Sequence, residues 1–167
     1  MMERLWTPWR LDYVTGAARN ETVDCVFCGV CGEDDLDPLV LYRGDRVFVI
    51  LNKYPYNNGH LMVVPSRHIG RMADADSEEL GELIRLVRIS EMVLTEAYHV
   101  HGINVGMNLG RSAGAGVPGH LHVHLVPRWE GDTNFMSVVS DTRVVPEEPA
   151  SSVNRLKPIF QKLITKE

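Results

Sequence analysis

The sequence predicts an α+β domain in which a mainly antiparallel sheet packs against one long helix. Three observations lead to this fold class. Short β-rich runs follow one another at hairpin spacing, one long amphipathic segment separates the third run from the fourth, and no glycine fingerprint opens a helix, as a Rossmann fold would require. The 167 residues, 44% hydrophobic and 23% charged, fit one such domain.

The first three predicted strands follow an irregular N-terminal arm. The run LVLYRGDRVFVILN, which begins at Leu39, contains two β-rich halves separated by Arg43, Gly44 and Asp45, and a glycine suits a tight hairpin turn. HLMVVP, which begins at His60, predicts the third short strand. These runs therefore predict a hairpin followed by a neighbouring strand.

Two helices are expected. In residues 74–98, Leu, Ile and Val recur at three-and-four spacing, and Asp76 with Glu79 matches a capping box. Residues 151–166 predict a short amphipathic C-terminal helix, and Pro158 is expected in its first turn, where a missing N–H is tolerated. The first of these helices is the long one of the fold class.

The fourth and fifth strands are predicted by GINVGMNLG and HLHVHLVP, which a glycine-rich loop joins. We expect a single domain over residues 1–167. Its parts are an N-terminal arm with a zinc knuckle (1–38), a catalytic core (39–136) and a C-terminal tail (137–167).

Charge and hydropathy exclude several partners. The formal net charge is −5, the isoelectric point is near 5.8, and Lys and Arg are scattered, which argues against nucleic acid as a partner. No run approaches the roughly 20 apolar residues that span a bilayer, and the first residues do not resemble a signal peptide. We therefore expect a cytoplasmic protein with no membrane partner.

Three cysteines lie close together at Cys25, Cys28 and Cys31, and an odd number at this spacing makes a poor disulfide framework. The CxxC pair of Cys25 and Cys28 is typical either of half a zinc site or of a redox pair. A zinc site would need distant histidines to complete it. Cys31 is expected to be a bystander thiol, with substitution for a ligand as the alternative.

The segment His120-Leu121-His122-Val123-His124 carries the strongest functional signal. Alternation on a strand would send the three imidazoles to one face, with neighbours about 6.6 Å apart along the strand, so that one phosphate could contact the second and third. Imidazole serves as a metal ligand or as a nucleophile and proton carrier. The preceding glycine-rich loop favours the second use, because its N–H groups can cradle phosphate oxygens.

HLHVHLV, from His120 to Val126, matches the signature His-φ-His-φ-His-φ-φ, with φ apolar, at every position. On this motif the chain resembles the histidine triad (HIT) superfamily of nucleotidyl hydrolases and transferases. The resemblance extends through FVILNKYPYNNGHLMVVPSRH and NVGMNLG, and it covers residues 39–128. LWTPWR and PRWEGDTNF look like the bacterial branch related to diadenosine tetraphosphate phosphorylases and hydrolases. The resemblance implies a HIT-like fold and cleavage of a dinucleoside polyphosphate or related adenine nucleotide.

The resemblance also implies roles for single residues. His122 would be the nucleophile that forms a nucleotidyl-histidine intermediate, and His124 would bind the phosphate and assist the leaving group. Asn52 falls at the position that binds the ribose hydroxyls, and His60 falls where the family keeps a supporting histidine. Asn108 and the backbone of the glycine-rich loop would stabilise the phosphate oxygens.

The glycine-rich loop departs from the family pattern. Many members carry Gln, Ser or Thr shortly before the triad, whereas this chain has AGVPGH, so either Ser112 substitutes or the backbone acts alone. Lys53, Arg111 and Arg128 could meet a polyphosphate, although such cations are more often solvated surface charges. The predicted nucleotide-binding residues are Asn52, His60, Asn108, Ser112, Gly114, Gly116 and His124.

In zinc-bearing members of the superfamily, two histidines complete the metal site. They correspond here to His68 and His120, which with Cys25 and Cys28 would make a closed and therefore structural Cys₂His₂ site. A magnesium ion bound with the nucleotide is a further expectation. The resemblance also implies a homodimer whose sheets join.

Two rival functions and one open role remain at this point. The chain could be a non-catalytic nucleotide- or zinc-binding regulatory module, or a metal-dependent enzyme that uses the triad itself as ligands, although the triad lacks a nearby acidic fourth ligand. Trp6 and Trp9 are expected to pack, whereas Trp129 could cover a nucleotide site in its own or a neighbouring subunit.

Overall fold

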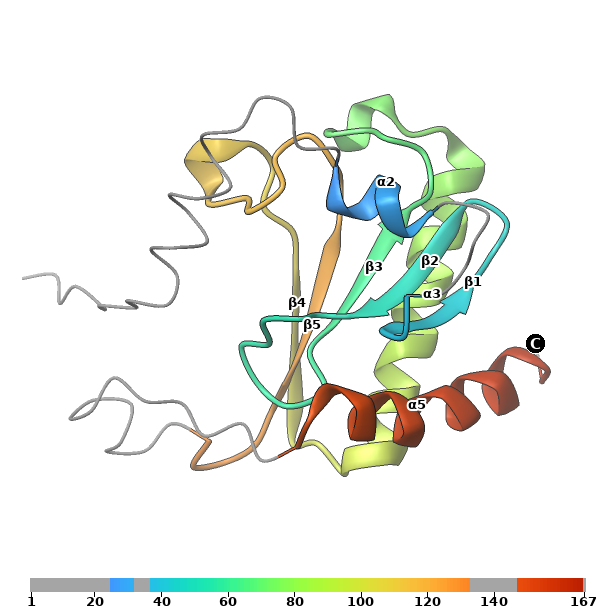
Figure 1. Ribbon diagram of the computed structural model, residues 1–167, viewed down its shortest axis with the longest axis vertical. Helices are drawn as coiled ribbons and strands as arrows, with labels where there is room; N and C mark the ends of the chain where they lie inside the picture. Colours follow the sequence, from blue (N-terminus) through green and yellow to red (C-terminus); the bar gives the residue numbers. More distant parts are fainter. Residues whose placement is uncertain (1–24, 32–36, 133–146, 167) are drawn as a thin grey trace, which may run out of the picture.

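A computed structural model describes residues 25–31, 37–132 and 147–166 of the chain. Its described strands form one antiparallel sheet in the order β1-β2-β3-β5-β4 (Figure 1). The strands are β1 (Val40–Arg43), β2 (Val47–Leu51), β3 (Leu61–Pro65), β4 (Gly102–Gly106) and β5 (Val123–Arg128). The predicted α+β class with an antiparallel sheet is confirmed. The arm residues Trp6 and Trp9 lie outside the described ranges.

The described helices are α2 (Val26–Val30), α3 (Ser77–Tyr98) and α5 (Pro149–Ile164), with single 3₁₀ turns at Met72–Asp74 and Arg111–Ala113. The predicted capping box opens α3. The Asp76 side chain accepts from the backbone N–H of Glu79, and the Glu79 side chain accepts from the backbone N–H of Asp76. Two otherwise unpaired N–H groups are thereby satisfied, which fixes where the long helix begins.

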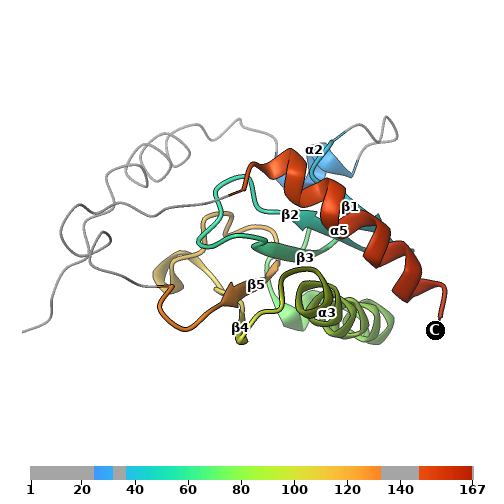
Figure 2. The ribbon, with the colours of Figure 1, turned by 90° about the horizontal axis from the view of Figure 1, so that it is seen from below.

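Helices cover both faces of the sheet, and α3 and α2 lie on opposite sides of it (Figure 2). On one face, α3 and α5 enclose the larger core, to which Leu86 and Phe160 contribute fully buried side chains. On the other face, Phe27 of α2 packs with strand residues such as Phe48 and Val64. The sheet that carries His124 is therefore packed from two sides.

The fifth strand begins later than the sequence predicts. His120 and His122 precede β5, and only His124 lies on it, opposite Met62 of β3. The reason is local, because the N–H of His120 bonds to the carbonyl of Val117, and the next N–H bonds to a loop carbonyl rather than to a strand. The expectation that one strand carries all three imidazoles was therefore wrong. The fourth strand also ends early, at Gly106.

Pro158 was expected in the first turn of the last helix, but it lies in the interior of α5, because that helix begins at Pro149. An interior proline costs a helix about 3 kcal/mol. Leu156 and Phe160 flank it and are fully buried, and burial of such side chains contributes about 1.5–3 kcal/mol each. Packing of the apolar face thus outweighs the local preference.

The loop between β2 and β3 approaches α3 closely at Gly59. This glycine has φ +71°, and a Cβ atom there would lie 2.7 Å from Cε2 of Tyr98. Only glycine combines this conformation with so little space. The contact fixes the end of the loop and thereby positions the next residue, His60, which immediately precedes β3.

Candidate active site and metal group

His122 is buried and has one orientation that its hydrogen bond specifies. Its Nδ1 lies 2.8 Å from the carbonyl oxygen of His120. Because a carbonyl only accepts, the proton of His122 is on Nδ1, and Nε2 carries a free lone pair. Burial lowers the pKa of His122, which favours the neutral ring. His122 therefore has the tautomer and the protonation state that a nucleophile requires.

His124 has the complementary form. The backbone N–H of Tyr56 donates to Nδ1 of His60 at 3.1 Å, so His60 carries its proton on Nε2 and donates it to Nδ1 of His124 at 2.9 Å. His124 therefore presents Nε2–H. Burial, and then the proximity of His124 and His122, lower the pKa of His60 to about 3, which keeps this histidine neutral. The rings of His122 and His124 lie 4.8 Å apart, centroid to centroid.

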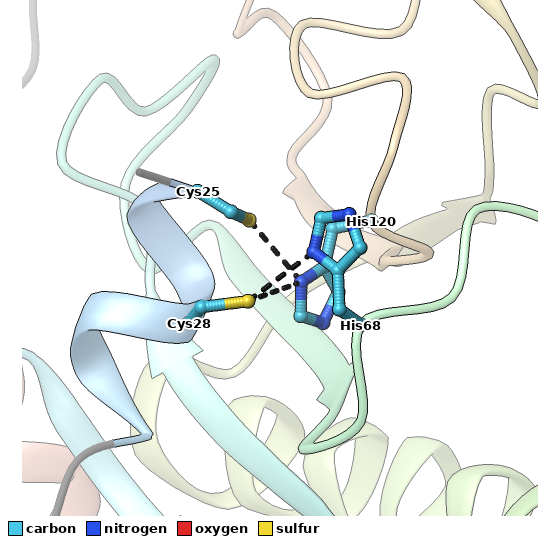
Figure 3. A group of neighbouring side chains, drawn as sticks. All are labelled: Cys25, Cys28, His68 and His120. Carbon is cyan, nitrogen blue, oxygen red and sulfur yellow. Dashed lines mark hydrogen bonds between the residues drawn. The ribbon is translucent and has the colours of Figure 1, made fainter. Parts of the chain in front are cut away.

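Four side chains, one of them from the triad, converge: Cys25 and Cys28 at α2, His68 in the loop after β3, and His120 (Figure 3). Sγ of Cys25 lies 3.2 Å from Nδ1 of His120, and Sγ of Cys28 lies 3.2 Å from Nδ1 of His68. All four candidate ligand atoms lie within 4.8 Å of one another. Ligands of a tetrahedral zinc ion are about 3.3–3.8 Å apart, so this group could hold a metal.

The tautomer of His120 also fits a metal. Its Nε2–H donates to the carbonyl of Pro65 at 2.8 Å, which leaves the lone pair of Nδ1 directed at the sulfur atoms. A hydrogen bond from the far ring nitrogen is the arrangement by which proteins orient histidine ligands. Cys31 lies outside the four-residue group and packs beside the apolar cluster of α2, and burial raises the pKa of its thiol.

The comparisons with known proteins agree with this geometry. Residues 33–131 match the HIT domain, and the AP-4-A phosphorylase of Mycobacterium tuberculosis is 40% identical over 152 residues, which cover 87% of this chain and 78% of that protein. The chain belongs to the HIT family. The resemblance of the sequence to this family is thereby confirmed.

Two further HIT relatives extend the comparison. The asymmetrical bis(5'-nucleosyl)-tetraphosphatase of Schizosaccharomyces pombe is 34% identical over 93 residues, which cover 56% of this chain and 50% of that protein. The crystal structure of a zinc-bound histidine triad family protein from Mycobacterium smegmatis superposes with a TM-score of 0.70 at 27% identity. The match covers 86% of this chain and 98% of that one. The HIT fold predicted from the sequence is therefore confirmed.

The other predicted nucleotide-binding residues of this HIT protein differ in how close they lie to the histidines. Asn52 lies beside His60, with 3.3 Å between its Nδ2 and Nδ1 of His60, and its Oδ1 accepts from the backbone N–H of Tyr54. Nδ2 of Asn108 donates to the carbonyl of Gly114 at 3.5 Å. The remaining loop positions are exposed: Ser112, Gly114 and Gly116. Contact of these loop residues with nucleotide stays a prediction.

The cations near the motif are distributed differently. Arg128 pairs with Asp132 through Nε and Nη2, at 2.6 and 2.8 Å, whereas Lys53 and Arg111 are exposed. Trp129 is half-buried, and its indole N–H donates to the carbonyl of Tyr98 at 3.4 Å. Trp129 thus packs within its own chain in this structure.

Two contacts at the triad escaped the sequence analysis. The N–H of Tyr56 fixes the tautomer of His60, and the ring of Phe27 packs against both His120 and His122. A backbone donor leaves no trace in side-chain chemistry. Phe27 had a signal, since it lies between the two cysteines of CVFC, but its partners are about a hundred residues away in sequence.

Proposed function

We propose that this HIT protein transfers a nucleotidyl group from a dinucleoside polyphosphate, with diadenosine tetraphosphate as the substrate. One observation carries the proposal. A buried imidazole with its Nε2 lone pair free, on His122, lies beside an imidazole that presents Nε2–H, on His124. A nucleophile and a hydrogen-bond donor for the leaving oxygen are thus adjacent, and each has the tautomer that its role needs.

The reaction proceeds in two steps. The Nε2 lone pair of His122 attacks the α-phosphorus, and the bond from phosphorus to the bridging oxygen breaks. The nucleotide leaves as a polyphosphate anion, whose new terminal oxygen accepts a hydrogen bond from Nε2–H of His124. The product is a nucleotidyl-His122 phosphoramidate. An acceptor with a lone pair on oxygen then displaces His122, so that the phosphorus–nitrogen bond breaks and the imidazole is regenerated. Asn52 beside His60, and the glycine-rich loop, are the proposed contacts of ribose and phosphate.

For the acceptor we propose inorganic phosphate. The supporting observation is the relative named AP-4-A phosphorylase, whose match covers 87% of this chain, whereas the match to the tetraphosphatase covers 56%. Water is the second candidate acceptor. The two differ in products, because phosphate yields ADP with ATP, and water yields AMP with ATP.

The test is to incubate the purified protein with diadenosine tetraphosphate, with and without inorganic phosphate, and to separate the products by anion exchange. We expect ATP and ADP only when phosphate is present, and a loss of at least about 10⁴-fold in His122→Ala, since removal of a covalent nucleophile has effects of this size. His101→Ala, at an exposed histidine outside the triad, is the matched control.

Other outcomes would select a different function. ATP with AMP in the absence of phosphate would identify a hydrolase. Tight nucleotide binding without turnover by the wild type would favour a non-catalytic regulatory module. Undiminished turnover by His122→Ala would contradict the nucleophile assignment, and loss of metal from His122→Ala would favour the reading in which the triad itself binds the metal.

We propose that the metal is one zinc ion held by Cys25, Cys28, His68 and His120. Four protein ligands close the coordination sphere, so the ion would stabilise the fold and take no part at the reacting phosphorus. The support is the two-thiolate, two-imidazole donor set and the zinc-bound relative of similar fold. A magnesium ion that accompanies the nucleotide stays a prediction.

The remaining proposals concern assembly and location. β4 pairs only with β5 in the described sheet and exposes 52% of Val105, which supports a homodimer in which two such edges join. None of the described helices is long and apolar enough to cross a membrane. We propose a cytoplasmic location, which the three free cysteines support, and one domain over residues 1–167 divided into arm, core and tail.

A further inference from the structure

Phe27 connects the metal group to the nucleophile. In sequence it lies between Cys25 and Cys28, and in space its ring packs against two rings of the triad. The ring centroid lies 5.3 Å from that of His120, at an interplanar angle of 68°, and 5.2 Å from that of His122, at 46°. The side chain is 4% exposed, so these contacts exclude water. Phe27 is thus the aromatic ring of α2 that touches the proposed nucleophile.

The position of Phe27 depends on how α2 is held. This helix has only five residues, and no side chain caps its N-terminus by a hydrogen bond. Its described attachments include the packing of Phe27 and Val30 on the sheet, a hydrogen bond from Arg43 to the carbonyl of Val30, and the thiols of the metal group. A helix this short is not stable by itself. Ligation of both cysteines would therefore fix the helix, and with it the ring of Phe27.

His120 provides a parallel connection. Its imidazole belongs to the metal group, and its carbonyl oxygen accepts the Nδ1–H of His122. The nucleophile is thus restrained by a hydrogen bond at one ring atom and by an aromatic contact on its surface. The hydrogen bond alone leaves the ring free to tilt about the bond to the carbonyl. The ring of Phe27 limits that tilt, together with the ring of His124, whose centroid lies 4.8 Å from that of His122.

We propose that Phe27 is a positioning residue that transmits occupancy of the Cys/His metal group to the orientation of His122. The inference rests on the proposed function, in which His122 attacks phosphorus and the four-residue group binds zinc. It goes beyond that function because it gives the metal group a second effect, on the rate of nucleotidyl transfer, without contact with substrate. Misplacement of a nucleophile by about 1 Å can cost about 100-fold in rate, so small tilts are measurable.

The first experiment compares Phe27→Leu with Phe48→Leu. Phe48 is a matched control, because it is buried in the same apolar cluster, and among the described residues its ring packs on no histidine. Zinc content, the Kd for a non-hydrolysable diadenosine tetraphosphate analogue and the single-turnover rate of His122 labelling are measured. We expect Phe27→Leu to keep the zinc and the Kd, and to slow labelling about tenfold more than Phe48→Leu does. Equal rates in the two variants would overturn the proposal.

The second experiment is a double-mutant cycle. Cys28→Ser removes a metal ligand, and Cys31→Ser, at the thiol outside the four-residue group, is its control. In the wild-type background, we expect Cys28→Ser to slow labelling about tenfold. In the Phe27→Leu background it should slow labelling less than about threefold, because the coupling through the ring of Phe27 is already broken. Full multiplication of the two effects would contradict transmission through Phe27.

A readout without turnover separates this inference from the proposed function. In protein labelled with ¹⁵N-histidine, NMR reports the tautomer and environment of each imidazole. We expect removal of zinc to shift the His122 signals in the wild type and in Phe48→Leu, and to shift them clearly less in Phe27→Leu, where only the connection through His120 remains. If His122 carries no nucleotidyl group in any variant, the proposed function fails, and this comparison still decides the coupling. Identical shifts in all three proteins would overturn it.

Discussion

The two histidines that flank His122 share a sequence motif but have opposite surroundings. His120 directs Nδ1 toward two thiols, since its Nε2–H is bound to the carbonyl of Pro65. His124 directs Nε2–H away from His60, because its Nδ1 accepts a hydrogen bond from that residue. One is arranged to ligate a cation, and the other to donate a hydrogen bond.

The neighbours of an imidazole, rather than its place in a motif, therefore determine its chemistry. A backbone carbonyl selects Nδ1–H in His122, and a second histidine, itself oriented by the N–H of Tyr56, selects Nε2–H in His124. Both selections rest on groups that can only donate or only accept.

The largest effect is expected on the hydrogen-bond-donor side. His124→Ala removes the group that hydrogen-bonds the leaving nucleotide and stabilises its developing charge, so turnover of diadenosine tetraphosphate should fall about 10²–10³-fold. A nitrophenyl ester of AMP expels a phenolate whose charge is spread over its ring, so its turnover should fall less than about tenfold. Steady-state rates with both substrates measure the contrast. Equal losses on the two substrates would assign His124 to phosphate binding alone.

A smaller effect, on stability, is expected on the metal side. His68→Ala removes one of the four candidate ligands, and the variant should lose its zinc. The free energy of unfolding should then fall by about 3 kcal/mol when zinc is present at about 100 times its Kd for the wild type. Metal analysis and denaturant unfolding provide the two measurements, with Cys31→Ser as control. A stoichiometric zinc content in His68→Ala would show that the site lies elsewhere.

The smallest effect concerns the loop that carries His68. The preceding residue, Arg67, hydrogen-bonds Glu79 at 2.9 and 2.7 Å. These bonds from Arg67, together with the backbone N–H of Asp76, lower the pKa of Glu79 from 4.5 to about 2 despite its burial. A carboxyl with a lowered pKa stabilises the fold above pH 4.5, and this contribution is lost as the pH falls toward 2.

Glu79→Gln measures that contribution. The wild type should unfold at higher denaturant concentration than the variant at pH 7, and the difference should shrink as the pH is lowered from 4.5 toward 2. Glu91→Gln, at an exposed position of the same helix, should behave like the wild type throughout. A difference between Glu79→Gln and the wild type that does not change with pH would exclude ionisation as its source.

Much of the fold could be predicted because local patterns and tertiary structure agree in it. The capping box of Asp76 and Glu79, the hairpin at Gly44 and the third strand all appear where the sequence indicates. The errors occur where tertiary contacts override local preference. Pro158 remains inside α5 because its neighbours are buried, and the segment before β5 bonds to loops instead of extending the strand.

The site divides in a similar way. The CxxC spacing indicated two of the candidate metal ligands, and the family resemblance indicated the two histidines. All four converge within 4.8 Å, although the sequence separates Cys25 from His120 by 95 positions. The sequence could not predict the protonation states of these histidines. Each state depends on one hydrogen bond whose partner is a backbone atom or a distant ring. The roles of His122 and His124 follow from those bonds. The motif identifies the two residues, but only the structure shows which ring nitrogen carries the proton.

Gly59 has a consequence for how variants of this protein would be interpreted. Any side chain at that position would meet the ring of Tyr98 and displace the residue that follows, which is His60. A mutational screen scored by activity would therefore rank position 59 beside the triad, although none of its atoms reacts. Tolerance to mutation at this site measures the space that is available beside the backbone. A position that tolerates no substitution therefore need not take part in the reaction.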